Sequence, residues 1–233
     1  MDKMKETLIQ GLPELGLDLP DPILDTLCGF GHAMVKQNEV MNLTGITEDS
    51  AVAKLHLLDS LTVLSTADLA GKSLIDVGCG AGFPGVPLAI ASPSAKITLL
   101  DSLGKRMKWL ETVLPTLGVS AECVTARAEE AVATRRESYD FATSRAVARL
   151  NILLELTAPY VKVGGAVLAM KGAMAKEELA ECSNAINKLG LKLEEVKEYP
   201  IDGAAHAVIV LRKVKPTPAQ YPRRFAKIKQ APL

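Results

Sequence analysis

Residues 73–85 read SLIDVGCGAGFPG, and this stretch decides how the rest of the chain is interpreted. Its first five residues are apolar or compatible with a β-strand. Glycines follow at positions 78, 80, 82 and 85, and Pro84 suits the first turn of a helix, where a missing N–H costs nothing. The pattern predicts a strand, a tight turn and a helix. Because glycine lets a ligand approach the main chain closely, the turn indicates a nucleotide-like cofactor.

Length and composition indicate one large α/β domain with a modest extension. The chain has 233 residues, of which 48% are hydrophobic. Lys+Arg and Asp+Glu are both 27, so the formal net charge is zero and any nucleic-acid contact must be local. The four cysteines form no C-x-x-C pair, which argues against a zinc site and a disulfide framework. The scattered cysteines indicate the reducing cytoplasm, and a monomer without metal is also expected. The N-terminus is charged and no apolar run is long enough to span a bilayer, so we expect no membrane attachment.

Three segments are expected along the chain. Residues 1–70 carry apolar side chains at spacings of three and four, which predicts a helical extension. Residues 71–215 alternate strand-like and helical stretches, which predicts a mostly parallel sheet. Within them, the runs 191–199 and 206–214 are joined by a connector too short for a crossover helix, so they should form an antiparallel hairpin at the edge of the sheet. Residues 216–233 are expected to form a basic tail.

The glycine turn by itself fits two kinds of cofactor. Residues 80–85 match the dinucleotide fingerprint G-x-G-x-x-G, whereas residues 76–82 match the D-x-G-x-G-x-G pattern of S-adenosylmethionine-dependent methyltransferases. Asp101, at the end of the second strand, could accept hydrogen bonds from the ribose of either cofactor. The acidic residue at the end of the first strand and the terminal hairpin favour the methyl donor. An NAD-dependent oxidoreductase is the alternative.

Several polar residues follow the predicted strands, where ligands bind in such sheets. Asp76 could face the ammonium group of the donor, or it could tie down the glycine turn. Glu129 follows the third strand and could contact the adenine edge, or it could simply favour a helix N-terminus. Arg145 and Lys171 follow the fourth and fifth strands, and Lys171 could meet a phosphate. The sequence offers no second ligand residue to pair with His56, so His56 is not assigned a catalytic role.

The C-terminal segment differs from the rest of the chain in its charge. After Asp202 there is no acidic residue, and Tyr221 and Phe225 lie among the basic ones. This composition predicts a tail that contacts RNA, and a solvated surface is the alternative. A non-enzymatic RNA-binding factor is therefore a third possible class. The basic residues are Arg212, Lys213, Lys215, Arg223, Arg224, Lys227 and Lys229.

Taken together, seven segments resemble the bacterial 16S ribosomal RNA guanine-N7 methyltransferases, also called the glucose-inhibited division protein B family. The segments are residues 41–44, 56–61, 76–85, 100–106, 127–129, 144–146 and 221–224. The resemblance implies a class I, Rossmann-like methyltransferase fold and S-adenosyl-L-methionine as the methyl donor. It also implies that the acceptor is a guanine of 16S rRNA, in a 30S subunit or an assembly intermediate.

The resemblance also implies roles for individual residues. By the family pattern, the cofactor-binding positions are Gly78, Phe83, Ala128, Glu129 and Arg145. The residues themselves add Asp76, Gly80 and Asp101 as cofactor contacts, and Arg145, Lys171, Arg223 and Arg224 as RNA contacts. Guanine N7 has a lone pair and no proton, so transfer needs positioning rather than a general base, and no catalytic residue is expected. The tail departs from the family pattern, because Phe225 and Ala226 stand where proline and glycine usually follow the arginine pair.

Overall fold

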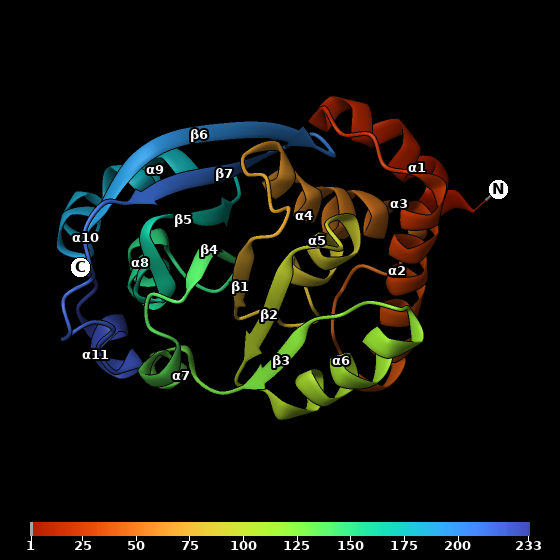
Figure 1. The fold of residues 1–233 in the computed structure, drawn as a ribbon. Coiled ribbons are helices and arrows are strands. Elements are labelled where there is room, and N and C mark those ends of the chain that lie inside the picture. Colours follow the sequence, from red (N-terminus) through yellow and green to blue (C-terminus); the bar gives the residue numbers. More distant parts are fainter. Residues whose placement is uncertain (1) are drawn as a thin grey trace.

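The structure, a computed structural model, describes residues 2–233 and contains one mixed seven-stranded sheet (Figure 1). The strand order is β3-β2-β1-β4-β5-β7-β6, in which β7 runs antiparallel to β5 and β6 antiparallel to β7, while the other pairs are parallel. The α/β sheet and its terminal hairpin were thus predicted correctly. The strands are β1 (Ser73–Val77), β2 (Lys96–Asp101), β3 (Glu122–Thr125), β4 (Tyr139–Arg145), β5 (Val161–Lys171), β6 (Leu191–Ile201) and β7 (Ala204–Lys213).

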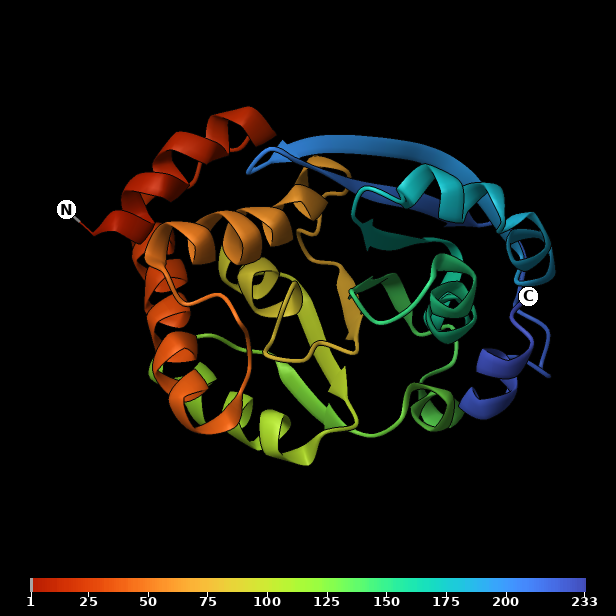
Figure 2. The same ribbon diagram turned by 180° about the vertical axis from the view of Figure 1, so that it is seen from behind.

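Helices cover both faces of the sheet (Figures 1 and 2). The N-terminal helices and those that follow β1 and β2 pack on one face, and those that follow β3, β4 and β5 pack on the other. No helix within residues 2–233 combines the length and the apolar character that a bilayer crossing requires. The helices are α1 (Lys3–Gly11), α2 (Asp21–Met41), α3 (Asp49–Val52), α4 (Asp59–Leu61), α5 (Gly85–Ala91), α6 (Gly104–Thr116), α7 (Ala128–Arg135), α8 (Leu150–Thr157), α9 (Ala175–Ala180), α10 (Ser183–Lys188) and α11 (Phe225–Gln230).

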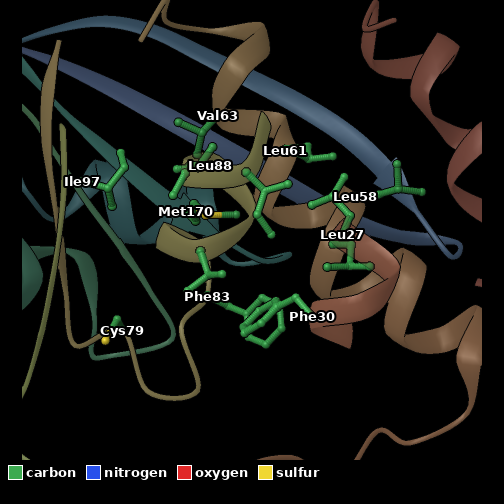
Figure 3. Close-up of a cluster of buried hydrophobic side chains, with 14 of the residues drawn as sticks. Leu27, Phe30, Leu58, Leu61, Val63, Cys79, Phe83, Leu88, Ile97 and Met170 are labelled. Carbon is green, nitrogen blue, oxygen red and sulfur yellow. The ribbon is translucent and has the colours of Figure 1, made fainter. Parts of the chain in front are cut away.

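The helical extension shares a core with the sheet. Alternate residues of β5 face opposite sides, as the two-residue period of a strand requires, so that Leu168 joins one cluster and Val167 the other. Figure 3 shows the first cluster, in which Leu27 and Phe30 of α2 lie near Phe83 of the glycine turn. The extension therefore packs directly behind the turn that was expected to hold the cofactor.

The C-terminal tail is folded against α8 and lies beside α7 (Figure 1). Glu155 of α8 is 0% exposed, and its carboxylate accepts hydrogen bonds from the Arg223 backbone N–H at 2.9 Å and from Nε and Nη2 of the same residue at 2.8 and 2.6 Å. Tyr221 and Ile228, which precede and follow Arg223 in the chain, are buried. The ion pair between Arg223 and Glu155 thus helps to fix the place of the tail, together with the hydrogen bonds that Arg136 donates to the carbonyls of Thr217 and Tyr221.

We expect Arg223→Met to lower the free energy of unfolding by about 3 kcal/mol, because it leaves the Glu155 carboxylate buried without its partner. Urea denaturation measures this change. The matched control is Arg224→Met, which alters an exposed neighbour and should stay within about 0.5 kcal/mol of the unsubstituted chain. Equal midpoints for the two variants would show that the ion pair does not hold the tail.

Candidate functional site

The glycine turn after β1 has a main-chain conformation that side chains would disturb. Gly78, Gly80 and Gly82 have φ angles of +76°, +58° and +95°. At Gly78 an added Cβ would lie 2.5 Å from Cγ2 of Val147, which is closer than real contacts allow. The turn therefore needs glycine for two reasons, its left-handed backbone and the approach of the loop after β4.

Asp76 lies beneath this turn and is 0% exposed. Its Oδ2 accepts a hydrogen bond of 2.8 Å from the N–H of Gly85, and its Oδ1 has no hydrogen-bond partner within residues 2–233. Burial raises the pKa of Asp76 to about 7, against the lowering effect of the Gly85 hydrogen bond. The hydrogen bond from Gly85 is the contact expected of a carboxylate that ties down the turn, the second of the two interpretations that the sequence allowed.

The first of three cavities along the carboxyl edge of the sheet has a volume of about 230 Å³ and lies at the ends of β1, β2 and β3. We call it the Asp101 cavity. Gly78, Asp101, Ala128 and Glu129, all predicted from sequence as cofactor contacts, line it together. The Asp101 carboxylate accepts hydrogen bonds from the N–H groups of Gly80 at 2.9 Å and of Leu103 at 2.8 Å. The main chain thus fixes the orientation of this carboxylate.

Phe225 of the tail lines the same cavity, beside Leu156 of α8. From the sequence we predicted that the whole tail contacts RNA, and we did not predict that Phe225 lines this cavity. Residue 225 is one of the positions where the chain departs from the family pattern. The two arginines before it differ in their surroundings, because Arg223 contacts Glu155 whereas Arg224 is exposed. The tail therefore contributes an aromatic wall to the cavity.

The second cavity, which we call the Gly80 cavity, has a volume of about 240 Å³ and adjoins the first through Gly78 and Val147. Phe83 lines it, and the centroid of the Phe83 ring lies 5.2 Å from that of Phe30 and 4.9 Å from that of His56. Arg106 also lines this cavity, and the sequence had not singled it out as a site residue. The only feature of the sequence that pointed to Arg106 was its place in residues 100–106, one of the segments that resemble the family.

Arg145, at the end of β4, is held inside the protein. Its Nη1 donates to Oδ2 of Asp59 at 2.7 Å and to the carbonyl of Leu55 at 3.0 Å, and Nη2 lies 3.3 Å from Nδ1 of His56. The side chain of Arg145 is 18% exposed and that of Asp59 is 6% exposed. Arg145 therefore connects the sheet to the helical extension while it lines the Gly80 cavity.

The pKa values of His56 and Asp59 are both lowered, but by different causes. Burial, helped by the charge of Arg145, lowers the pKa of His56 to about 4, so that its ring is neutral near pH 7. Its Nε2 is 2.8 Å from the Thr44 hydroxyl. Burial opposes the charge of Asp59, but hydrogen bonds from His206 and Arg145 outweigh it and hold the pKa of Asp59 below its ordinary value. Asp59 is thus an anion and His56 is a neutral hydrogen-bonding group. His56 belongs to a π-helical turn, Ala53–Leu58, of the kind frequently found at functional sites.

The third cavity has a volume of about 550 Å³ and adjoins the Gly80 cavity through His56, Arg145 and Ala146. We call it the His206 cavity. Lys171 lines it but is almost buried, because its Nζ lies 2.7 Å from a carboxylate oxygen of Glu178 and donates to the carbonyl of Ala148 at 2.6 Å. The contacts of Lys171 are therefore internal, whereas the sequence suggested a phosphate.

The fold defines the class of protein. The structure is similar to that of M. jannaschii TYW2 in complex with AdoMet, with a TM-score of 0.56 and 14% identity over 67% of this chain and 75% of the other. It is also similar to a 16S rRNA (adenine(1408)-N(1))-methyltransferase from Catenulisporales acidiphilia, with a TM-score of 0.53 and 18% identity over 64% and 87% of the two chains. The chain therefore has the Rossmann-like methyltransferase fold, as predicted.

Sequence comparison gives the family. The family described as "GidB: rRNA small subunit methyltransferase G" matches residues 24–204. Two similar relatives carry the name "Ribosomal RNA small subunit methyltransferase G". The one from Alkaliphilus metalliredigens is 44% identical over 94% of this chain and 95% of its own length, and the one from Thermoanaerobacter sp. is 40% identical over 100% and 99%. The chain belongs to this family, which confirms the resemblance seen in the sequence.

The raised pKa of Asp76 predicts how stability depends on pH. The folded chain retains the Asp76 proton up to about pH 7, whereas the ordinary pKa is 3.8, so the stability this proton gives is complete at low pH and is lost as pH rises towards 7. Asp76→Asn keeps an oxygen for Gly85 and does not titrate. We expect its free energy of unfolding, relative to the unsubstituted chain, to increase between about pH 4.5 and about pH 7.5.

Urea denaturation at both pH values measures this difference. Asp18→Asn, at an exposed position, is the control and should show no comparable trend. A constant difference between Asp76→Asn and the unsubstituted chain would mean that Asp76 ionises as an ordinary aspartate.

Proposed function

We propose that this chain transfers the methyl group of S-adenosyl-L-methionine to N7 of a guanine in 16S rRNA. The observation that carries the proposal is the row of three adjoining cavities along the carboxyl edge of the parallel strands, in a chain of this family. Ligands of open α/β sheets bind at that edge. A row of cavities suits a reaction that brings a donor and an acceptor together.

The residues of the Asp101 cavity fit the nucleoside of the donor. The Asp101 carboxylate is already oriented by two N–H groups, and a carboxylate has about four acceptor sites, so it can also accept from ribose hydroxyls. Gly78 leaves the main chain open where a Cβ would collide with Val147. Ala128 and Glu129 begin α7 and would contact the adenine edge.

The Gly80 cavity fits the amino-acid end of the donor. Arg106 and Arg145 line it, and a guanidinium group matches a carboxylate in geometry and charge. Because Arg145 is already paired with Asp59, Arg106 is the better candidate for the donor carboxylate. Asp76 would act beneath the turn by holding its shape, and Phe83 by packing it against the helical extension.

Positioning is the main task of the protein in this reaction. The donor, when bound, supplies a methyl group whose bonding electrons stay on sulfur, while the N7 lone pair forms the new N–C bond and the purine takes up the positive charge. No proton is removed, so no general base is needed. The neutral His56 and the paired charge of Arg145 add no unbalanced cation beside the base that becomes positive.

For the RNA we propose a narrower set of contacts than the sequence suggested. Arg224 is exposed and can contact phosphate, whereas Arg223 would act by anchoring the tail to Glu155. Arg145 and Lys171 would act at the cavity walls, close to the reacting base. We also propose that the protein works as a cytoplasmic monomer on a 30S subunit or an assembly intermediate.

The test uses labelled S-adenosylmethionine with 16S rRNA and 30S particles from cells that lack the protein. We expect label in one guanine, with the chain cleavage that N7-methylguanine shows after borohydride and aniline treatment. In parallel, S-adenosylmethionine and not NADH should raise the melting temperature, because a ligand at one hundred times its Kd adds about 2.7 kcal/mol. Stabilisation by NADH would point to the oxidoreductase. Donor binding without transfer to any ribosomal substrate would point to the RNA-binding factor.

Phe225 gives a sharper prediction for the donor site. An aromatic ring stacked on a base contributes about 1–3 kcal/mol, so Phe225→Ala should weaken S-adenosylmethionine binding by about tenfold. Isothermal titration calorimetry measures the affinity. Lys227→Ala, at an exposed position on α11, is the matched control. An unchanged Kd in Phe225→Ala would place the aromatic ring outside the donor site.

A further inference from the structure

The His206 cavity is the largest of the three, and the donor, as placed above, does not need it. It is lined by residues at the ends of β4 and β5 and near the start of β7, on the far side of the Gly80 cavity from Asp101. A donor bound through Asp101 would fill the first two cavities. The atom that receives the methyl group must then approach from the third.

We propose that the His206 cavity receives the acceptor guanine, and that His206, oriented by Asp59, forms a hydrogen bond with the Watson–Crick edge of that base. This inference rests on the function proposed above. Cavities of about 300–1,000 Å³ are typical of small-ligand sites, and the volume of about 550 Å³ falls within that range.

The pairing with Asp59 determines which atom of His206 faces a ligand. Nδ1 of His206 is 2.8 Å from Oδ1 of Asp59, and a carboxylate can only accept, so Nδ1 carries a proton. The hydrogen bond to Asp59 also raises the pKa of His206 above its ordinary value, which favours the charged ring, and in that ring Nε2–H is a donor. The other Asp59 oxygen is held by Arg145 at 2.7 Å, so the carboxylate has a fixed orientation. His206 is the accessible member of this group, since its side chain is 23% exposed and that of Asp59 is 6% exposed.

A donor at Nε2 suits guanine in particular. The Watson–Crick edge of guanine presents the O6 acceptor, whereas adenine carries the N6–H₂ donor at that position. N7 lies beyond O6, on the major-groove edge of the purine. A base held by its Watson–Crick edge therefore leaves N7 uncovered, so that it can point towards the Gly80 cavity.

Carboxylates of the cavity walls lie beside a base that becomes cationic. Arg145 pairs with Asp59, Lys171 pairs with Glu178, and the charged form of His206 pairs with Asp59 as well. Glu178 and Asp59 both line the cavity. These carboxylates would reduce the repulsion between the cationic side chains and the positive charge that the purine gains.

The experiment titrates 7-methylguanosine monophosphate into the full chain saturated with S-adenosylhomocysteine, by isothermal titration calorimetry. We expect the unsubstituted chain to bind this nucleotide and His206→Leu to bind it about tenfold more weakly, the cost of one lost hydrogen bond. His206→Gln, which retains a hydrogen-bond donor, should recover part of the loss. His32→Leu is the matched control, because His32 is exposed on α2 and lines none of the three cavities.

Donor affinity separates a local effect from misfolding, since all variants should bind S-adenosylmethionine as tightly as the unsubstituted chain. Equal binding of the methylated nucleotide by His206→Leu and the unsubstituted chain would overturn the proposal. So would failure of the unsubstituted chain to bind it, or a parallel loss of donor affinity in His206→Leu. If the unsubstituted chain binds the donor but methylates no ribosomal RNA, the proposed function fails, while the nucleotide titration still decides what the cavity binds.

Discussion

The ion pair between Arg145 and Asp59 connects the parts of this molecule that make a site possible. Arg145 comes from the end of β4, and Asp59 comes from the helical extension. A further hydrogen bond joins Arg145 to the Leu55 carbonyl, and Asp59 reaches His206 on β7. Because both charges are largely removed from water, each needs the other, and the geometry of one is imposed on its partner. The extension is therefore held against the carboxyl edge. Arg145 lines two of the three cavities, and Asp59 lines one of them.

The site is assembled from three parts of the chain that lie far apart in sequence. The parallel strands supply the turn after β1 and Asp101, as such sheets do in general. The N-terminal extension supplies His56 and Asp59, and the tail supplies Phe225. The latter two segments close the cavities on either side. They determine the shape of the site, while the sheet determines where it lies.

Local patterns predicted the positions of residues more reliably than their partners. Asp101, Ala128 and Glu129 were expected at strand ends and do line one cavity, because the carboxyl ends of parallel strands meet at one edge. Lys171 was also placed correctly, but its ammonium group faces Glu178, which lies on α9. The sequence predicted an RNA contact for Arg223, but in the structure its partner is the buried Glu155. A basic side chain does not reveal in sequence whether its anion belongs to a ligand or to a distant helix.

The sequence by itself determined the succession of elements along the chain, which is a strand, a glycine turn and a helix, followed by alternating strands and helices and a terminal hairpin. It also determined the family that these motifs resemble. It could do so because backbone freedom and hydrophobic period act over a few residues. Only the tertiary structure decided which charges are neutralised inside the protein, that Phe225 joins the Asp101 cavity, and that His206 meets Asp59. Most of these facts depend on pairings between residues far apart in the chain, for which no local pattern exists. Arg223 and Glu155 are 68 positions apart, and His206 and Asp59 are 147 positions apart.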